Sequence, residues 1–457
     1  TLCKQAETGE VYRPEITHIK KRLSSFKLIV LGFAGVIVLG ALILMLPFSS
    51  TAGVVTPFHE ALFTSTSAVC VTGLVVQDTG SYWSAFGQTV ILLMIQIGGL
   101  GVVTVAAFFA MLSGRKISLM QRSTMQDAIS APKVGGIVRL TRFIVRGTFL
   151  IELIGMIVML PTFCGNFGIK GIWMAAFHSI SAFCNAGFDI LGTAENKYPS
   201  LTGYIGNPAI NITIMLFTIV GGLGFLTWDD IYTNKWHFKK YRMQSKVILV
   251  TTAILIIVPA VFFFFCDFTG LPLAERILAS LFQSVTPRTA GFNTADLPAM
   301  TGSSKAIMTM LMLVGGSPGS TAGGMKTTTL AVLILSAFSV CRKKDDAEVC
   351  GRRIDGSAVK NAAAVAVMYF LLFFVGGIVI STAEGLPLST CLYETASAVG
   401  TVGLTLGITP QLGVLSQLIL IVLMYLGRVG GLTLIYAAVS NKNHSGAKLP
   451  LEKITVG

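Results

Sequence analysis

The sequence contains one short pattern four times: Ala68-Val69-Cys70-Val71-Thr72-Gly73-Leu74, Ala182-Phe183-Cys184-Asn185-Ala186-Gly187-Phe188, Thr286-Pro287-Arg288-Thr289-Ala290-Gly291-Phe292 and Ala398-Val399-Gly400-Thr401-Val402-Gly403-Leu404. Each copy ends in two variable residues, a glycine and a large apolar residue. The successive glycines are 114, 104 and 112 residues apart. A pattern with a near-constant period marks a repeated structural unit. We therefore interpret the four loops as members of one ring.

The composition indicates an integral membrane protein. Of the 457 residues, 53% are hydrophobic and 12% are charged, and the mean hydropathy is +0.75. A soluble domain has about 25% charged residues. The eight cysteines occur singly, which favours buried thiols over a zinc site or a disulfide framework. The N-terminal 25 residues are polar and basic and the apolar run after them is long, so no cleavable signal peptide is predicted.

The same order of apolar segments surrounds each glycine pattern. A run of about 20 residues, enough to cross a bilayer, precedes a short helix that leads into the pattern, and a second long helix follows. This order predicts an all-α integral membrane protein with eight transmembrane helices in four helix–pore-loop–helix repeats around one pseudo-fourfold pore. The first helices are predicted at 28–47, 140–163, 247–268 and 359–382, the short helices at 56–69, 172–183, 273–285 and 387–399, and the second helices at 86–112, 208–228, 305–341 and 412–439.

The basic residues predict the orientation. Of the 34 Lys and Arg residues, 27 lie in the N-terminal segment, the three links between repeats and the C-terminal tail. Positive charge concentrates on the cytoplasmic side, so both termini are predicted to be cytoplasmic and the short helices to enter from outside. This distribution explains the net charge of +13 without nucleic acid. The predicted parts are a cytoplasmic segment 1–25, repeats 26–115, 138–236, 244–342 and 358–441, and a cytoplasmic tail 442–457.

The four loops have the chemistry of a cation filter. Irregular backbone at membrane depth is tolerated where it is buried or lines a watery cavity, and rings of backbone carbonyls replace the hydration shell of potassium in channel filters. Glycine allows successive carbonyls to turn toward an axis, and the negative end of each short helix points at the cation. Glycines that only permit close helix packing are the alternative, which fits a lone glycine better than four in register.

The second helix of the third repeat is interrupted by Gly315-Gly316-Ser317-Pro318-Gly319-Ser320-Thr321-Ala322-Gly323-Gly324. Proline and several glycines prevent a continuous helix, and we interpret this loop as a gate beneath the filter rather than a packing kink. Arg428 lies inside the last predicted helix, where an ionisable residue is costly and therefore a functional-site hypothesis.

The remaining polar residues at membrane depth receive structural interpretations. Lys326 is expected to extend to the cytoplasm, and Arg288 to brace the third loop against Glu394 or Glu60. The acidic residues near predicted helix ends are interpreted as interfacial, and the histidines of the short helices as satisfied polar groups rather than metal ligands: Glu152, Asp267, Glu384, His59 and His178. For the glycine pairs 98–99, 221–222 and 430–431, close helix packing and hinging both stay open. No motif predicts an enzyme or an organic cofactor.

From residue 25 onward the sequence resembles the Trk/Ktr/HKT superfamily of potassium-translocating subunits, most specifically at 286–292 and 315–324. With eight spans it is more similar to the KtrB branch than to TrkH. The resemblance implies that carbonyl groups of the four loops coordinate the transported potassium ion and that the interrupted helix moves to let ions pass. The implied filter residues are Val71, Thr72, Gly73, Asn185, Ala186, Gly187, Thr289, Ala290, Gly291, Thr401, Val402 and Gly403. The implied gate residues are Gly316, Ser317, Gly319, Ser320, Thr321, Gly323 and Arg428.

The resemblance also implies partners and a location. The expected assembly is a homodimer in the plasma (inner) membrane of a bacterium, docked on a cytoplasmic ring of RCK-type nucleotide-binding subunits similar to KtrA. Family members with serine at the first filter glycine tend to pass sodium, so glycine at all four positions favours potassium. One alternative function stays open, an ion-coupled secondary transporter for potassium or sodium. Four parallel repeats with filter-like loops favour the channel-like function.

Overall fold

The computed structural model describes residues 25–113, 117–129, 135–235, 237–431 and 433, and these residues are mostly helical. Within these ranges the strands are limited to a hairpin of β1 (Glu348–Val349) and β2 (Arg352–Arg353). The predicted helical class is confirmed apart from this hairpin. The predicted C-terminal tail and the N-terminal residues 1–24 lie outside the described residues.

Four long helices each precede a short helix that packs against them. All four long helices have the length and hydropathy of a membrane-spanning segment. The short helices end at the glycine patterns, as predicted. The long helices are α1 (Ser25–Leu44), α6 (Ile137–Phe167), α10 (Met243–Cys266) and α14 (Gly356–Glu384), and the short helices are α2 (Phe58–Val69), α7 (Lys170–Phe183), α11 (Leu273–Val285) and α15 (Leu388–Gly400).

The second helices are broken, and the prediction that those of repeats one, two and four are continuous was wrong. The helix axis turns by 95° at Gly101 and by 98° at Gly224, and α16 ends at Val429 with Gly430 as its C-cap. These glycines have φ of 86°, 88° and 88°, a conformation that glycine adopts without steric cost. The segments are α3 (Ala85–Leu100) with α4 (Val102–Leu112), α8 (Pro208–Gly222) with α9 (Phe225–Asn234), α12 (Gly302–Leu313) with α13 (Thr327–Cys341), and α16 (Val414–Val429).

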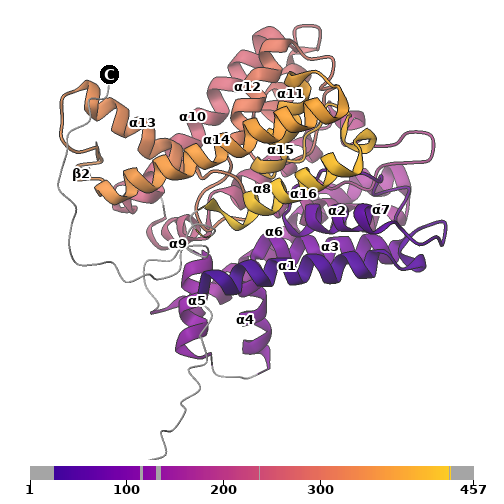
Figure 1. Ribbon diagram of the computed structural model, residues 1–457, viewed down its shortest axis with the longest axis horizontal. Helices are drawn as coiled ribbons and strands as arrows, with labels where there is room; N and C mark the ends of the chain where they lie inside the picture. The colour runs from indigo at the N-terminus through magenta and orange to yellow at the C-terminus, as the bar shows by residue number, and fades with distance from the viewer. Residues whose placement is uncertain (1–24, 114–116, 130–134, 236, 432, 434–457) are drawn as a thin grey trace, which may run out of the picture.

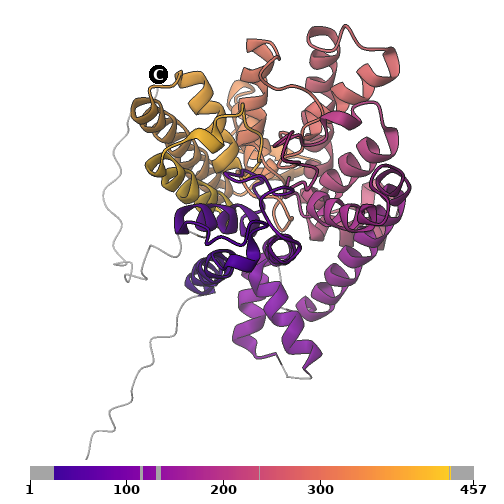
Figure 2. The same cartoon turned by 90° about the vertical axis from the view of Figure 1, so that its right-hand side faces the viewer.

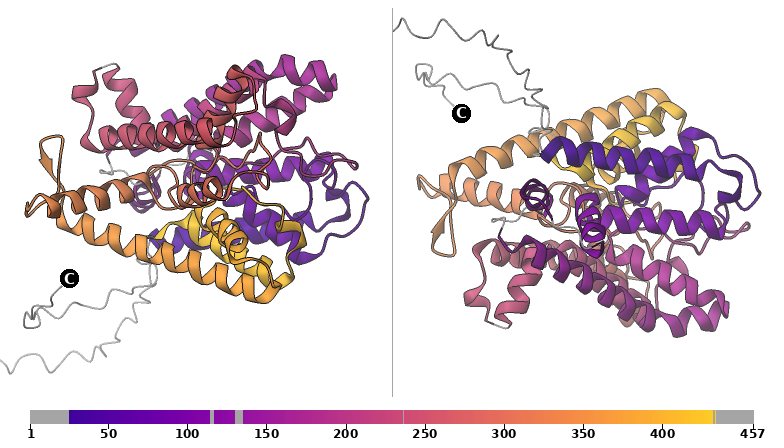
Figure 3. Two further views of the ribbon diagram at one scale, coloured as in Figure 1. Left: turned by 90° about the horizontal axis from the view of Figure 1, so that it is seen from above. Right: turned by 90° about the horizontal axis from the view of Figure 1, so that it is seen from below.

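The helices are arranged around a common centre (Figure 2). Each second helix packs against the short helix of the next repeat: α3 on α7, α8 on α11 and α12 on α15. A fourth contact, of α16 on α2, closes the ring. In the right panel of Figure 3 α16 and α1 lie side by side, and Tyr425 Oη donates a 2.7 Å hydrogen bond to Val30 O.

Glycines bring the second helices close to the ends of the short helices. A Cβ at Gly98 would lie 2.0 Å from Val69 O, and one at Gly221 would lie 2.3 Å from Phe183 O. The equivalent glycine of α16 is Gly427, where a Cβ would lie 2.2 Å from the carbonyl oxygen of α15 residue 399. The pairs 98–99 and 221–222 therefore serve close packing, and the bends occur at later glycines outside these pairs. In the pair 430–431, Gly430 is the C-cap of α16.

Among the described residues, four helices and two bent pairs meet the criteria for membrane spans, and α13 and α16 are apolar but shorter. Eight spans therefore stay a prediction. The sequence did not predict α5 (Leu119–Ile129), which lies beside α4 at the end of the bundle where α1 begins (Figure 1). The short 3₁₀ helices are Pro47–Ser49, Thr202–Tyr204, Phe238–Lys240 and Thr409–Gln411.

Candidate functional site

The four glycine loops, residues 71–73, 185–187, 289–291 and 401–403, meet in a closed ring. A Cβ at Gly73 would lie 3.1 Å from the Cα of Gly187, and a Cβ at Gly187 would lie 2.7 Å from the Cα of Gly291. A Cβ at Gly291 would lie 2.5 Å from Val402 O, and one at Gly403 would lie 3.0 Å from the Cα of Gly73. These approaches leave no room for a side chain, which is the physical reason for glycine in every loop.

The backbone of each loop alternates in handedness. The residue two positions before each glycine has φ between 51° and 65°, the glycine has φ between 69° and 95°, and the residue between them has no positive φ. In a strand, successive carbonyls point to opposite sides, and a reversal of φ at every second residue turns them to the same side. Val71 is β-branched, and positive φ there is a strained conformation of the kind that clusters at functional sites.

Serines of the short helices hold the loop amides. The carbonyl oxygen of Ser67 accepts from Thr72 N at 2.8 Å, and its Oγ accepts from Gly73 N at 3.0 Å. Ser397 makes the same two bonds with residues 402 and 403. Ser181 O accepts from Ala186 N at 2.8 Å. The third loop differs, since Ala290 N bonds to Thr286 O.

The carbonyl groups of the twelve loop residues accept no hydrogen bond from the part of the chain that the structure describes. All twelve residues are buried, and no described residue donates a hydrogen bond to any of these carbonyl oxygens. More than nine in ten buried backbone carbonyls in native proteins are paired, so twelve unpaired ones in one ring require a partner such as water or a cation. The chemistry of the ring suits an unhydrated cation.

A cavity of about 230 Å³ lies over the ring, lined by all four glycines and by Asp78 and Asp189. The Asp78 carboxylate accepts from Ser81 N and Oγ, both at 2.7 Å, and from Tyr198 N at 3.0 Å. Asp189 accepts from Leu191 N at 3.2 Å. Burial and the neighbouring Asp78 carboxylate raise the pKa of Asp189, outside the spanning helices, to about 7. The sequence analysis missed this acidic cavity, because the two carboxylates are more than 100 residues apart in the chain.

The 315–324 loop lies on the other side of the ring and is held by backbone bonds to the second helices. Ser317 N donates to Gly222 O at 2.9 Å, and Thr321 N donates to Gly221 O at 3.2 Å. Gly324 N donates to Gly427 O at 3.2 Å. A Cβ at Gly323 would lie 2.2 Å from Thr401 Oγ1, so the loop touches the glycine ring directly.

The structure brings all predicted gate residues to this loop and its surroundings. Gly316 is adjacent to Ala322, and a Cβ there would lie 2.5 Å from the Cβ of Ala322. Ser317 Oγ and Thr327 Oγ1 are 3.0 Å apart, and Ser320 Oγ donates to Ala322 O at 3.5 Å. Gly319 has φ of 65°, and a Cβ there would lie 2.4 Å from Ile129 O at the end of α5.

Arg428 fastens the 315–324 loop to α3. Its Nη1 donates to Thr321 O, and its Nη2 donates to Gly98 O and, at 3.3 Å, to Gly99 O. The planar guanidinium presents donors in a rigid fork, so one side chain joins the third repeat to the first.

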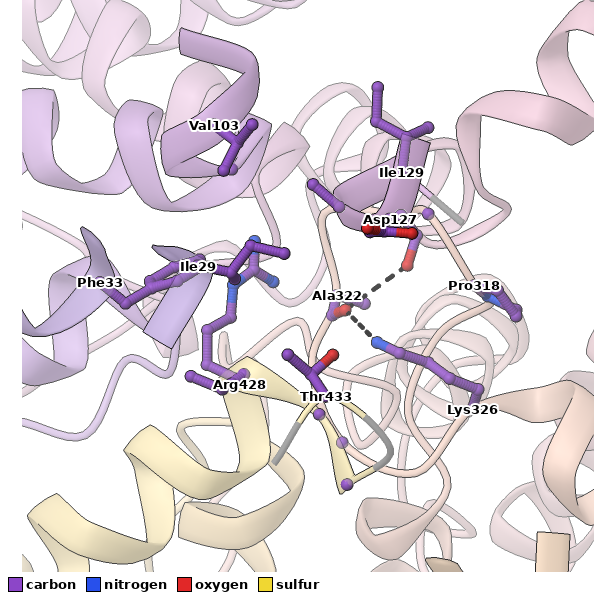
Figure 4. Close-up of a pocket in the computed structure, with 18 of the residues that line it drawn as sticks. Ile29, Phe33, Val103, Asp127, Ile129, Pro318, Ala322, Lys326, Arg428 and Thr433 are labelled. Atoms are coloured by element: carbon purple, nitrogen blue, oxygen red, sulfur yellow. Dashed lines mark hydrogen bonds between the residues drawn. The ribbon is translucent and has the colours of Figure 1, made fainter. Parts of the chain in front are cut away.

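Lys326 lines a second cavity, of about 270 Å³, to which the 315–324 loop contributes and the twelve ring residues do not (Figure 4). Its Nζ donates to Ala322 O at 2.8 Å and to Gly323 O at 3.4 Å. The expectation that Lys326 extends to the cytoplasm was wrong, because unpaired carbonyls of the loop lie within its reach. Arg428 and Asp127 line the same cavity.

Arg288 and Glu152 also differ from the predictions. Arg288 donates to Thr252 O at 3.3 Å and Gly315 O at 3.4 Å, and no carboxylate lies within ion-pair distance among the described residues, so the predicted partners were wrong. Glu394 instead accepts from the hydroxyl groups of residues 405 and 409. Glu152 is 5% exposed in the middle of α6 and is not interfacial.

The other structural interpretations have mixed outcomes. Asp267 and Glu384 lie at helix ends, and their carboxylates accept from Thr301 N at 3.1 Å and Gly413 N at 2.9 Å. His178 Nδ1 bonds to Met174 O at 2.8 Å while its Nε2 has no partner among the described residues, and no metal-ligand cluster is found in the described ranges. The prediction that the cysteines are buried thiols was partly wrong, since three of the described cysteines are exposed: Cys266, Cys341 and Cys350.

The fold and the site define a class. The chain is a helical membrane protein whose short helices converge on one ring of carbonyl groups that no described residue pairs, with one cavity over the ring and another beside the 315–324 loop. That arrangement is the architecture of a protein that moves cations across a membrane.

The comparisons with known proteins give the family. The TrkH family, described as "Cation transport protein", matches residues 25–445. The chain is 38% identical over 451 residues to the "Potassium/sodium uptake protein NtpJ" of Enterococcus hirae, covering 96% of this chain and 98% of that protein. It is 36% identical over 424 residues to the "Ktr system potassium uptake protein B" of Bacillus subtilis, covering 91% and 93%. The chain therefore belongs to the TrkH family of cation transport proteins.

A solved structure supports the fold. The crystal structure of the potassium transporter TrkH from Vibrio parahaemolyticus matches with a TM-score of 0.73 at 18% sequence identity, over 92% of this chain and 86% of that one. The resemblance stated from the sequence is confirmed.

Proposed function

We propose that the chain conducts potassium ions across the membrane in a channel-like manner, through a filter made by the four glycine loops. The filter residues are those predicted from the sequence, and eight spanning segments in four repeats surround one pore. The observation that carries the proposal is the ring of twelve buried carbonyl groups for which no described residue is a donor. A potassium ion that has lost its hydration shell is a suitable partner for such a ring.

The 315–324 loop is proposed as the gate of this pore. It lies between the glycine ring and the cavity that contains Lys326 and Arg428. Its backbone hydrogen bonds to the second helices are individually weak, since each neutral hydrogen bond contributes only about 1 kcal/mol net, and its stronger contact is the one that the Arg428 guanidinium donates. A loop held in this way can leave the pore without unfolding the helices that flank it.

Potassium is the proposed cargo, with sodium as the competing ion. Potassium is in the names of the two relatives described above, and sodium is also in the name of one. Glycine at all four ring positions favours potassium. The same names support a regulated assembly, since one relative is a component of a Ktr system. We propose a homodimer in a bacterial plasma membrane with cytoplasmic termini, controlled by an RCK-type cytoplasmic ring that contacts the basic links.

Ion flux into liposomes tests this proposal, with potassium, rubidium, sodium and lithium compared in turn. The decisive variant is Gly73→Ser, whose Cβ would lie 2.5 Å from Ala186 O in the ring. The matched control is Gly53→Ser, since Gly53 also has positive φ, 67°, but has open space around it. We expect passive, potassium-preferring flux that loses its preference in Gly73→Ser only. Flux that requires a counter-moving or co-moving ion and ignores Gly73→Ser would favour a secondary transporter.

A further inference from the structure

Asn185, in the second glycine loop, has a side chain that contacts three other parts of the protein. Its Nδ2 donates to Thr218 O in α8 and to Thr289 Oγ1 in the third loop, both at 3.2 Å. Its Oδ1 accepts from Thr321 Oγ1 in the 315–324 loop at 3.1 Å. The residue is fully buried and has φ of 58°, a conformation that asparagine tolerates better than most residues.

Thr321 is the point at which the 315–324 loop is held from three directions. Its amide donates to Gly221 O at 3.2 Å, and its carbonyl accepts from Arg428. Its hydroxyl donates to Asn185 Oδ1 at 3.1 Å, with Phe183 O as a second, longer acceptor at 3.3 Å. Gly221 makes this meeting possible, because a Cβ there would lie 2.5 Å from Asn185 Oδ1 and 2.7 Å from Thr321 Oγ1.

The other three equivalent positions, all of which the structure describes, do not make such a bond. The side chain of Val71 has no polar group, and the hydroxyl of Thr289 accepts from Asn185. Thr401 Oγ1 is buried without a partner, although Gly323 lies against it. Asn185 is thus the one of the four that links the ring to the 315–324 loop by a side-chain hydrogen bond.

We propose that Asn185 is a positioning residue that couples the gate to the filter. Its bond with Thr321 stabilises the loop beneath the ring, and the same amide group fixes the second and third filter loops relative to each other. Departure of the 315–324 loop removes the donor from Oδ1, so the side chain is freer to turn and these two filter loops lose part of their support. Gate position and ion preference are therefore linked. This inference rests on the proposed function.

A double-variant cycle tests the coupling, with potassium and sodium flux into liposomes as the measurement. Thr321→Val removes the hydroxyl at constant shape, and Asn185→Gly removes the amide while tolerating the positive φ. We expect Thr321→Val to raise potassium flux about fivefold, the effect of losing one buried hydrogen bond. Asn185→Gly should raise it at least as much, because it also removes the bonds to Thr218 O and Thr289 Oγ1. Because both variants remove the same bond, the double variant should fall about fivefold below the product of the single effects.

Two further variants serve as controls. Thr321→Ser keeps the hydroxyl and should retain wild-type flux. Thr327→Val makes the same change at a buried threonine whose hydroxyl contacts Ser317 and not the filter, so its effect should multiply with that of Asn185→Gly. Thr321→Val should also lower the potassium-to-sodium preference although it touches no filter carbonyl, which a loss of loop stability alone would not do.

The outcomes separate the inference from the proposed function. Multiplicative effects in the cycle, or an unchanged ion preference in Thr321→Val, overturn the inference while leaving selective flux and its loss in Gly73→Ser intact. Absence of passive selective flux in the wild type overturns the proposed function. If Asn185→Gly does not fold, as judged by size-exclusion profile, the comparison of Thr321→Val with Thr321→Ser and Thr327→Val decides.

Discussion

Replacement of Arg428 separates two ways in which a positively charged side chain can keep a pore closed. The guanidinium joins Thr321 O of the 315–324 loop to the carbonyls of Gly98 and Gly99 in α3. It also places positive charge beside the proposed ion path. Arg428→Ala removes both the fastening and the charge, whereas Arg428→Lys keeps the charge but cannot bridge two elements with a rigid fork.

The size of the effect follows from the bonds that are lost. Hydrogen bonds from a charged donor contribute about 1.5–3 kcal/mol each. Arg428 and Gly99 line the 270 Å³ cavity, so water can enter the space that the guanidinium leaves and pair with the freed carbonyls. We therefore count the net loss as that of one such bond. A loss of about 2 kcal/mol shifts the closed–open equilibrium by about 30-fold. We expect Arg428→Ala to raise potassium flux by at least about tenfold, with saturation once the loop is mostly open.

The assay is potassium flux into liposomes at matched protein content. A fastening role predicts that Arg428→Lys raises flux to an intermediate level, because a lysine reaches only one of the two elements. A purely electrostatic barrier predicts wild-type flux in Arg428→Lys. Unchanged flux in a well-folded Arg428→Ala protein would refute the reasoning altogether.

Two other predictions concern the outer cavity and the helix contacts. The pKa of Asp189 is raised to about 7 from an ordinary 3.8, so this carboxyl is protonated in acid. Potassium flux at subsaturating concentration should therefore rise between external pH 6 and 8, while folding stability falls as pH rises through about 7. An identical pH profile of flux in Asp189→Asn would contradict this prediction. Gly98→Ala should lower the free energy of unfolding by about 1–3 kcal/mol through overpacking against Val69. The measurement is thermal unfolding in detergent, and the control is Gly35→Ala, whose new Cβ has nothing within 4 Å. Equal melting temperatures of the two variants would count against the close contact.

The sequence was sufficient for the features that depend on length and repetition. The long helices followed from apolar runs that match a bilayer, as α1 and α10 illustrate. The glycine ring followed from the recurrence of one pattern, since only a shared structural role explains glycine at four equivalent positions. Positive φ at Val71 was not predictable, because a β-branched residue gives no local signal for that conformation.

Features that depend on tertiary partners were predicted poorly. The bends at Gly101 and Gly224 occur in otherwise apolar helical sequence, where a single glycine has no distinctive local signature. Lys326 and Arg288 bond to backbone carbonyls that become available only because the second helix of the third repeat is interrupted. Glu152 lies near the centre of both the predicted helix, 140–163, and α6, so its assignment to a helix end contradicted the predicted bounds themselves.

The most direct test of the central claim is to locate bound cations in a structure determined with rubidium or thallium in place of potassium. We expect density on the axis of the ring, at coordinating distance from carbonyl oxygens of all four glycine loops. Occupied cation sites elsewhere between the helices, with an empty ring at saturating concentrations, would contradict the account.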